Sequence, residues 1–386
     1  MFSNLSLSLN ESPVSYPITD SKLPFSEYIS RTRQIIEDRR PGAKPDVINA
    51  NCPFELYPAK PIRSGQQFKF GTLLIHGLLD SPFSFRDIGS NLQSKGILSR
   101  SILLPGHGTT PTDLMNVTYH DWLQAVRYGV DTLRNEVEEL YLIGYSTGAT
   151  LSIYQALQDI KIAGIILLSP AIRIKSPVDL VVGWNQLLGL FSKNRDWLYV
   201  EDEIDYAKYK SIAYNAVTQV SKLTAVIHEL RRHRALTTPM LMVMSREDET
   251  ISSHRAIEFF SGLPNKDSKL LLYTSCDHRY PDTRILPRIT SYPELNITHF
   301  SHASIPFAPD NPHYGENGDY PFAAHAEAGK FVYGAYNKFE IRFFDFMQQL
   351  GLTSLKRSEL TYNPDFNFMT DQITQFIFNA KNTPAA

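Results

Sequence analysis

The stretch LYLIGYSTGATLSIY, residues 140–154, decides the fold class of this chain. The apolar run LYLI is followed by Gly144-Tyr145-Ser146-Thr147-Gly148, and an amphipathic run begins directly afterwards. A serine between two glycines at a strand-to-helix turn is typical of a nucleophile elbow, because small neighbours let other backbone come close. The pattern predicts a strand over residues 139–146, a helix over 148–158, and Ser146 as a nucleophile.

Apolar segments alternate with amphipathic segments on both sides of this elbow. We expect strands at residues 71–77, 99–108, 139–146, 162–172, 239–245 and 269–275, and helices at 81–96, 118–136, 148–158 and 253–263. Such alternation is typical of a parallel sheet with helices on both faces. The strands are continuously apolar, as burial on both faces requires. The sequence therefore predicts an α/β fold with a mostly parallel central sheet.

Two regions fall outside the alternation and divide the chain into parts. Residues 1–53 are predicted to form an N-terminal extension with a surface helix over 26–40. Residues 173–237 carry long helical patterns at 178–191 and 213–232, and we expect no strand among them. The α/β core is then expected at 54–172 and 238–386, with a helical insertion between its two parts. Further helices are expected at 339–351 and 367–379.

Composition and charge exclude several classes of protein. The 386 residues carry 38 basic and 40 acidic side chains, so there is no basic surplus for a nucleic-acid partner. The two cysteines, Cys52 and Cys276, form no disulfide framework. No signal peptide and no apolar run of about 20 residues is visible, which predicts a cytoplasmic protein without stable membrane insertion. The histidines lack the spacing of metal ligands and no glycine-rich phosphate loop is present, so we expect neither metal nor cofactor.

A serine nucleophile that attacks a carbonyl needs two N–H donors for the oxyanion that forms. One is expected at Thr147, the residue after the nucleophile, at the start of a helix. The second should come from the loop after an earlier strand, where His76-Gly77-Leu78 follows TLLI. We therefore expect the N–H of Leu78 as the second donor, and His76 as a residue that orients the turn.

The acid of a serine triad should follow the strand at 239–245, where Arg246-Glu247-Asp248-Glu249 stand. Asp248 is favoured because it lies in the turn directly after the strand, and a short carboxylate can fix the tautomer of a histidine. Glu247 is the alternative. In other respects Glu247 and Glu249 read as a solvated loop.

Two histidines satisfy the chain order serine, aspartate, histidine. His278 follows the strand at 269–275 in SCDHRYP, and His302 lies in the later stretch LNITHFSHASIP. His299 shares that stretch but is expected to point elsewhere. His313 lies in DNPHYGENG, which is typical of turns. The residues alone leave the base open between His278 and His302.

Several motifs, found together in this order, resemble a known family. They are HGLLDSPFSFRDIG (76–89), LLPGHGTTPTDL (103–114), YHDWLQAV (119–126), GYSTG (144–148) and LLSPA (167–171). These segments are similar to the serine α/β-hydrolases of the bacterial carboxylesterase and monoacylglycerol-lipase type. The resemblance is close over residues 70–172 and moderate over 239–263. Thr147 departs from it, since methionine is usual there, and residues 1–50 and 279–365 lie outside the pattern of compact members.

The resemblance implies an α/β-hydrolase fold in which the insertion at 173–237 is a lid. It also implies Ser146 as nucleophile, Leu78 and Thr147 as oxyanion donors, and Asp248 as acid. Compact members carry the base soon after the last strand, which favours His278. The stretch SHASIPFAPDNPHYG resembles a segment of longer bacterial relatives in which the histidine after serine is the base. On this ground we expect His302 as the base, with His278 as the alternative.

These expectations together predict an enzyme that hydrolyses carboxylic esters through an acyl-enzyme. The substrates would be esters of short or medium acyl chains, or monoacylglycerols. An acyltransferase or thioesterase would use the same residues, because fold alone does not distinguish the acceptor. A silent binding protein that keeps the fold is the alternative from another class. The sequence leaves the oligomeric state open.

Overall fold

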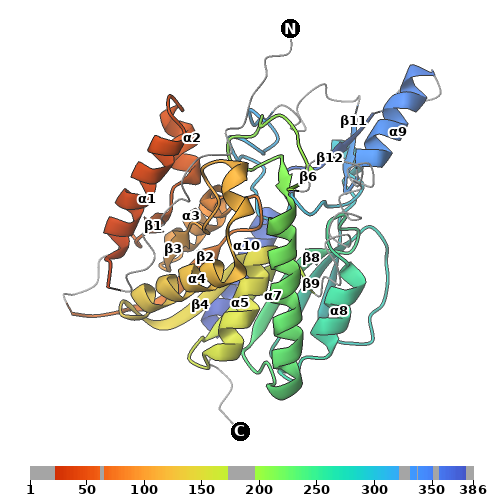
Figure 1. The fold of residues 1–386 in the computed structure, drawn as a ribbon. Helices are drawn as coiled ribbons and strands as arrows, with labels where there is room; N and C mark the ends of the chain where they lie inside the picture. The colour runs from red at the N-terminus through yellow and green to blue at the C-terminus, as the bar shows by residue number, and fades with distance from the viewer. Residues whose placement is uncertain are drawn as a thin grey trace.

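The computed structural model describes residues 22–60, 65–172, 196–320, 331–336, 338–350 and 356–379 (Figure 1). At its centre lies an eight-stranded sheet in the order β1-β3-β2-β4-β5-β8-β9-β10. β1 is antiparallel to β3, and all other neighbours in this sheet are parallel. The strands are β1 (Phe54–Leu56), β2 (Phe68–Ile75), β3 (Leu98–Ile102), β4 (Val137–Tyr145), β5 (Gly164–Leu168), β8 (Met240–Ser245), β9 (Lys269–Thr274) and β10 (Ile285–Ile289). The expected mostly parallel central sheet is confirmed.

Successive residues of the central strands enter two separate hydrophobic cores on opposite faces of the sheet. In β4, Leu140 and Leu142 belong to one core, whereas Tyr141 and Ile143 belong to the other. All four side chains are buried. Because neither face of these strands meets water, neither set of side chains is polar, which explains the continuous apolar runs in the sequence.

Helices cover both faces of the sheet (Figure 1). The first core is closed by α4 (Tyr119–Arg134), α5 (Thr147–Gln158), α7 (Tyr214–His233) and α8 (Ser253–Ser261). The second is closed by α3 (Arg86–Ser94) and α10 (Phe366–Asn379). The helices expected near residues 81–96, 118–136, 148–158, 253–263 and 367–379 are therefore present, with ends shifted by a few residues.

The N-terminal extension packs against the body of the fold through α1 (Phe25–Arg39) and α2 (Pro45–Asn51). The Tyr28 hydroxyl donates to the carbonyl of Leu103 (3.2 Å) and accepts from the Leu103 N–H (3.0 Å). Asn51 donates its side-chain amide to the carbonyl of Tyr206 (2.7 Å). The extension thus contacts both the loop after β3 and the segment that precedes β7.

Residues 196–237 differ from the strand-free insertion that the sequence predicts. β6 (Trp197–Tyr199) pairs with β7 (Ile212–Ala213) in antiparallel orientation, so that expectation is wrong. These strands are two or three residues long, too short for a periodic signal. α7 buries Val217, Val220 and Leu223 in the core that α5 lines, so it belongs to the helical layer over the sheet. The expected helix at 178–191 lies outside the described residues.

The C-terminal third contains three strands that the sequence did not predict. β10 extends the sheet beside β9, and its ILPRI segment carries Pro287 at the edge position that proline tolerates. β11 (Phe331–Gly334) and β12 (Lys356–Glu359) form a separate parallel pair. The helix expected at 339–351 is α9 (Lys338–Gln349). These short, half-polar strands lack the apolar runs on which the sequence analysis relied.

Candidate active site

Ser146 stands between β4 and α5 in a backbone conformation that few side chains adopt. Its φ is 53° and its ψ is −113°. A Cβ at Gly148 would lie 1.9 Å from the Ile75 carbonyl oxygen, and one at Gly144 would lie 2.3 Å from the Gly148 carbonyl oxygen. Both flanking positions therefore require glycine. The predicted elbow is present, and its geometry places the serine at the carboxyl edge of the parallel strands.

The turn after β2 lies against this elbow. A Cβ at Gly77 would lie 3.2 Å from the Ser146 Cβ, so the two turns are in close contact. The next residue, Leu78, lines the same cavity as Ser146 and Thr147. α5 begins at Thr147, and the first amides of a helix have no acceptor within the helix.

Two buried histidines brace the turn that carries Leu78. His76 donates from Nδ1 to the Gly77 carbonyl (2.8 Å) and accepts at Nε2 from the Leu104 N–H (3.0 Å). His107 accepts at Nε2 from the N–H of Leu79 (3.1 Å), whose φ is 65°. Burial lowers the pKa of His76 to about 4 and that of His107 to about 3, so both are neutral at pH 7. His76 therefore orients the turn, as expected; the part played by His107 was not predicted.

The side chain of Asp248 is fully buried in the loop after β8. Its Oδ1 accepts from the N–H groups of Thr250 and Ile251, both at 2.9 Å. Its Oδ2 lies 2.8 Å from Nδ1 of His302. Since the carboxylate accepts, Nδ1 donates, and Nε2 is left as the ring nitrogen that can take up a proton.

His302 is held at three points. Besides the bond to Asp248, its N–H donates to Glu249 (3.1 Å). Its carbonyl accepts from the hydroxyl of Tyr145, the residue before Ser146, at 3.2 Å, and the two rings lie 5.2 Å apart. The base candidate from a distant part of the sequence is thus fastened to the elbow itself.

Two other histidines, His278 and His299, differ from His302. The ring of His278 is exposed and lies edge-on to Tyr280 at 4.9 Å. It is not among the residues that line the cavity of Ser146. His299 contacts Thr298 (2.8 Å) through Nδ1, away from that cavity. Of the two candidate bases, the structure brings only His302 to Asp248.

The expectation that Glu247 and Glu249 form a solvated loop is wrong. Glu247 accepts from the N–H and the hydroxyl of Ser275, which follows β9. Glu249 lines the cavity of Ser146 and accepts the N–H of His302. Burial, followed by the charge of Asp248, raises the pKa of Glu249 well above its usual value. The sequence of residues 246–249 alone does not show that residues 275 and 302 cover this loop in the fold.

The cavity that contains Ser146 has a volume of about 220 Å³. One side is formed by the elbow and the turn after β2, with Leu78, Ser146 and Thr147. Most of the remaining lining, which we call the distal wall, comes from three separate segments. It consists of Asp205, Lys208, Tyr209, Lys210, Phe307, Tyr314, Tyr320, Glu359 and Thr361. Charged and phenolic groups on this wall make the cavity polar as well as aromatic.

A buried network organises the distal wall. Asp205 accepts from Nε2 of His313 (3.2 Å) and from the Tyr314 hydroxyl (2.6 Å). The other ring nitrogen of His313 lies 2.5 Å from Asp319. Burial raises the pKa of Asp205, but the hydrogen bond from His313 and the charge of Lys210 outweigh burial, so the net shift is downward. No sequence pattern indicates this network, because Asp205 is more than a hundred residues away from His313 and Tyr314.

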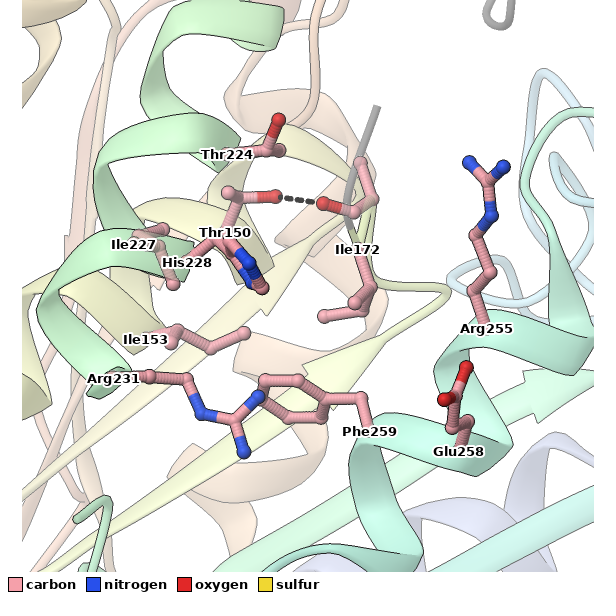
Figure 2. Close-up of a pocket in the computed structure, with 11 residues that line it drawn as sticks. Thr150, Ile153, Ile172, Thr224, Ile227, His228, Arg231, Arg255, Glu258 and Phe259 are labelled. Carbon is pink, nitrogen blue, oxygen red and sulfur yellow. Dashed lines mark hydrogen bonds between the residues drawn. The ribbon is translucent and has the colours of Figure 1, made fainter. Parts of the chain in front are cut away.

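A second cavity of about 200 Å³ lies between α5, α7 and α8 (Figure 2). Its walls include Ile153, Ile227 and Phe259, and the guanidinium of Arg231 lies over the Phe259 ring at 4.2 Å. None of the predicted site residues lines it. The chemistry predicted from the sequence therefore belongs to the cavity of Ser146.

Within the described residues, no group of three or more His, Cys, Asp or Glu side chains is arranged to hold a metal ion. No helix in that part of the chain has the length and apolar character needed to cross a bilayer.

Comparison with known proteins agrees with this geometry. A family model described as "Serine aminopeptidase, S33" matches residues 69–281, more than half of the chain. The chain belongs to this family. A curated relative, "Thermostable monoacylglycerol lipase" of Bacillus sp. (strain H-257), is 25% identical over 214 residues, which are 54% of this chain and 82% of that protein. This S33-family chain is thus a serine hydrolase with the α/β-hydrolase fold, of the esterase and lipase type, which confirms the resemblance stated from the sequence.

Two of the solved structures that match part of this chain are titled as lipolytic enzymes or as an esterase. One is described under "LipS and LipT, two metagenome-derived lipolytic enzymes", with a TM-score of 0.48, 23% identity, and coverage of 58% of this chain and 86% of that chain. Another is Est1E from Butyrivibrio proteoclasticus with ferulic acid bound, with a TM-score of 0.44, 20% identity, and coverage of 60% and 88%.

The S33 family match ends before the segment that supplies His302 and most of the distal wall. Ser146, Asp248 and His278 lie within residues 69–281, whereas His302 lies beyond them. The histidine that contacts Asp248 therefore comes from outside the region that identifies the family.

Proposed function

We propose that this chain hydrolyses carboxylic esters with Ser146 as nucleophile, His302 as base and Asp248 as the acid that orients it. The main observation behind the proposal is the set of contacts that fix His302 in place. Its Nδ1 is bound by Asp248 at 2.8 Å, its carbonyl by the residue before Ser146, and its side chain lines the cavity of Ser146. This arrangement supports a neutral imidazole with Nε2 free to act on the serine hydroxyl.

The reaction follows in two steps. Nε2 of His302 takes the proton of the Ser146 hydroxyl as Oγ attacks the ester carbonyl, and the oxyanion is held by the N–H groups of Leu78 and Thr147. The tetrahedral intermediate collapses, and the imidazolium gives its proton to the departing alcohol. A water molecule, deprotonated by the same nitrogen, then cleaves the acyl-enzyme and restores the serine.

Esters of short or medium acyl chains and monoacylglycerols are the proposed substrates. A cavity of about 220 Å³ supports a small acyl or glycerol group, and the curated relative is named a monoacylglycerol lipase. The polar distal wall supports esters with hydrogen-bonding groups over purely aliphatic ones.

The test is fluorophosphonate labelling of wild type and Ser146→Ala, followed by hydrolysis of an ester series. Labelling and turnover should both be lost in Ser146→Ala, with a fall in kcat of about a thousandfold or more. Labelling that survives the substitution would refute the nucleophile. Formation of an acylated acceptor in place of free acid would indicate an acyltransferase, and labelling without turnover of any ester, thioester or acceptor would indicate a silent binding protein.

A further inference from the structure

Lys208 is a charged group inside the candidate active site that the proposed mechanism does not use. It lines the cavity together with Ser146 and His302. Its Nζ lies over three aromatic rings, at 4.7 Å from the centre of Phe307, 5.1 Å from Tyr314 and 5.6 Å from Tyr145. The third ring belongs to the residue before the nucleophile, so the ammonium lies close to the elbow.

The backbone around Lys208 is fixed to both sides of the cavity. Asp205 accepts the N–H of Lys208 (3.2 Å) while its carboxylate is bound in the network with His313. The N–H of Tyr209 donates to the Leu79 carbonyl at 2.7 Å, beside the expected oxyanion donor. Lys208 is therefore held in a defined position relative to the reacting carbonyl, although its own side chain is only half-buried.

Within the part of the chain that the structure describes, Lys208 Nζ has neither an ion-pair partner nor a hydrogen-bond acceptor. Lys210, the neighbouring lysine of the cavity, differs: it donates to the hydroxyl of Tyr320 and lies in the field of Asp205 and Glu359. Aromatic faces attract an ammonium but supply no hydrogen-bond acceptor along its N–H bonds. The three N–H bonds of Lys208 are thus available to a ligand.

Within the described residues, none of the acidic side chains that line the cavity forms an ion pair with Lys208. Asp80 is buried, both of its oxygens lie 2.7 Å from the Ser84 hydroxyl, and burial raises its pKa in spite of Lys208. Burial also raises the pKa of Glu249. Asp205 is already shared by His313, Tyr314 and Lys210, and Glu359, the remaining acidic residue of the lining, lies in the field of Lys210. Lys208 is then a positive charge of the cavity to which no acidic side chain of the lining is paired.

We propose that Lys208 binds an anionic oxyacid group of the substrate, so that the preferred ester carries a carboxylate or phosphate on the part that occupies the cavity. This inference rests on the proposed function and names its substrate class. A charge-assisted hydrogen bond from the ammonium would hold the anion, and the rings of Phe307 and Tyr314 would cover the adjoining carbons.

The test compares matched anionic and neutral esters in wild type, Lys208→Met and Lys208→Arg. The carboxylate arm uses mono-p-nitrophenyl glutarate against p-nitrophenyl valerate. The phosphate arm uses 1-butyrylglycerol 3-phosphate against 1-butyrylglycerol, with release of butyrate as the readout. Lys222→Met, on the exposed side of α7, is the matched control.

Wild type should prefer the anionic ester in at least one arm by about tenfold or more in kcat/KM. Lys208→Met should remove that preference and change the neutral ester less than threefold, Lys208→Arg should keep part of it, and Lys222→Met should leave it intact. The preference of wild type should also shrink as salt is raised, a measurement that needs no variant.

Two results would overturn the inference and can be told apart. If Ser146-dependent hydrolysis shows no anionic preference in either arm, or if Lys208→Met lowers anionic and neutral esters equally, the ester hydrolase stands and the role of Lys208 falls. If no ester is hydrolysed in a Ser146-dependent way, the proposed function falls and this inference falls with it.

Discussion

The two sides of the cavity are built on different principles. The elbow side is local. A Cβ at Gly144 would meet the backbone of Gly148 within the same turn, and a Cβ at Gly148 would lie 1.9 Å from the carbonyl oxygen of Ile75 in β2. The distal wall is assembled from segments near residues 205, 313 and 359, through side-chain hydrogen bonds and ring contacts. Backbone sterics therefore fix the position of Ser146, whereas long-range polar contacts shape the distal wall.

The proposed base, His302, provides the strongest test of this difference, because it is brought to Ser146 by contacts between distant parts of the chain. His302→Ala should lower kcat by about a thousandfold or more, since the proton acceptor of Ser146 is lost. His278→Ala, at an exposed position, should change kcat less than twofold. Ester hydrolysis at saturating substrate measures both, with circular dichroism to verify folding. Loss of turnover in a folded His278→Ala variant, with His302→Ala still active, would reverse the assignment.

The elbow side could be predicted from the sequence because its steric constraints act on residues that are neighbours in the chain. GYSTG, the HG turn and the apolar run of β4 lie on contiguous segments, and each residue type follows from a steric need of its own backbone. Asp248 was also accessible, since a buried strand ends directly before it. The choice between His278 and His302 could not be derived from spacing, because either chain length can return to the same loop.

The distal wall could not be predicted from any local sequence motif. Asp205, Lys208 and His313 look like ordinary polar loop residues, and their partners are distant in the chain. The expectation that Glu249 lies in a solvated loop is wrong for the same reason, because its burial depends on residue 302 and not on its neighbours in sequence. The short strands β6, β7 and β10 also lack a periodic pattern. Tertiary contacts, which one sequence does not display, determine all of these features.

The steric constraint on the elbow side can be tested by adding one methyl group at Gly148. Gly148→Ala should lower the free energy of unfolding by about 3 kcal/mol or more, because the new methyl group would clash with the backbone of Ile75 and His76, which cannot move as a side chain can. Gly262→Ala is the matched control. There the nearest atom is 3.6 Å away and φ is −80°, so the change should be neutral or stabilising by about 0.5 kcal/mol. Urea denaturation measures both variants.

A Gly148→Ala variant that is as stable and as active as wild type would contradict this view of the elbow side, because the elbow would then accept a Cβ at position 148. A similar loss in Gly262→Ala would instead show that the effect belongs to glycine replacement in general.

The smallest expected effect concerns the neutral histidines that brace the turn of Leu78. The folded-state pKa is about 4 for His76 and about 3 for His107, against 6.5 in an ordinary environment. Below pH 6.5 the unfolded chain therefore binds protons that the folded protein does not, so acidification lowers the free energy of unfolding. Each histidine should contribute about 1.5 kcal/mol of this loss between pH 6.5 and 5.0.

His107→Gln keeps an acceptor for the Leu79 N–H and removes one titrating group, so its stability should fall less steeply over this range than that of wild type. The raised pKa of Glu249 acts in the opposite direction, because the folded protein then holds a proton that the unfolded chain releases. The difference between variant and wild type, measured by urea denaturation at each pH, removes that contribution. His254→Gln, on the exposed side of α8, should follow the wild-type slope. If His107→Gln follows it too, His107 is not held neutral by burial, and only its hydrogen bond to the Leu79 N–H braces the turn of Leu78.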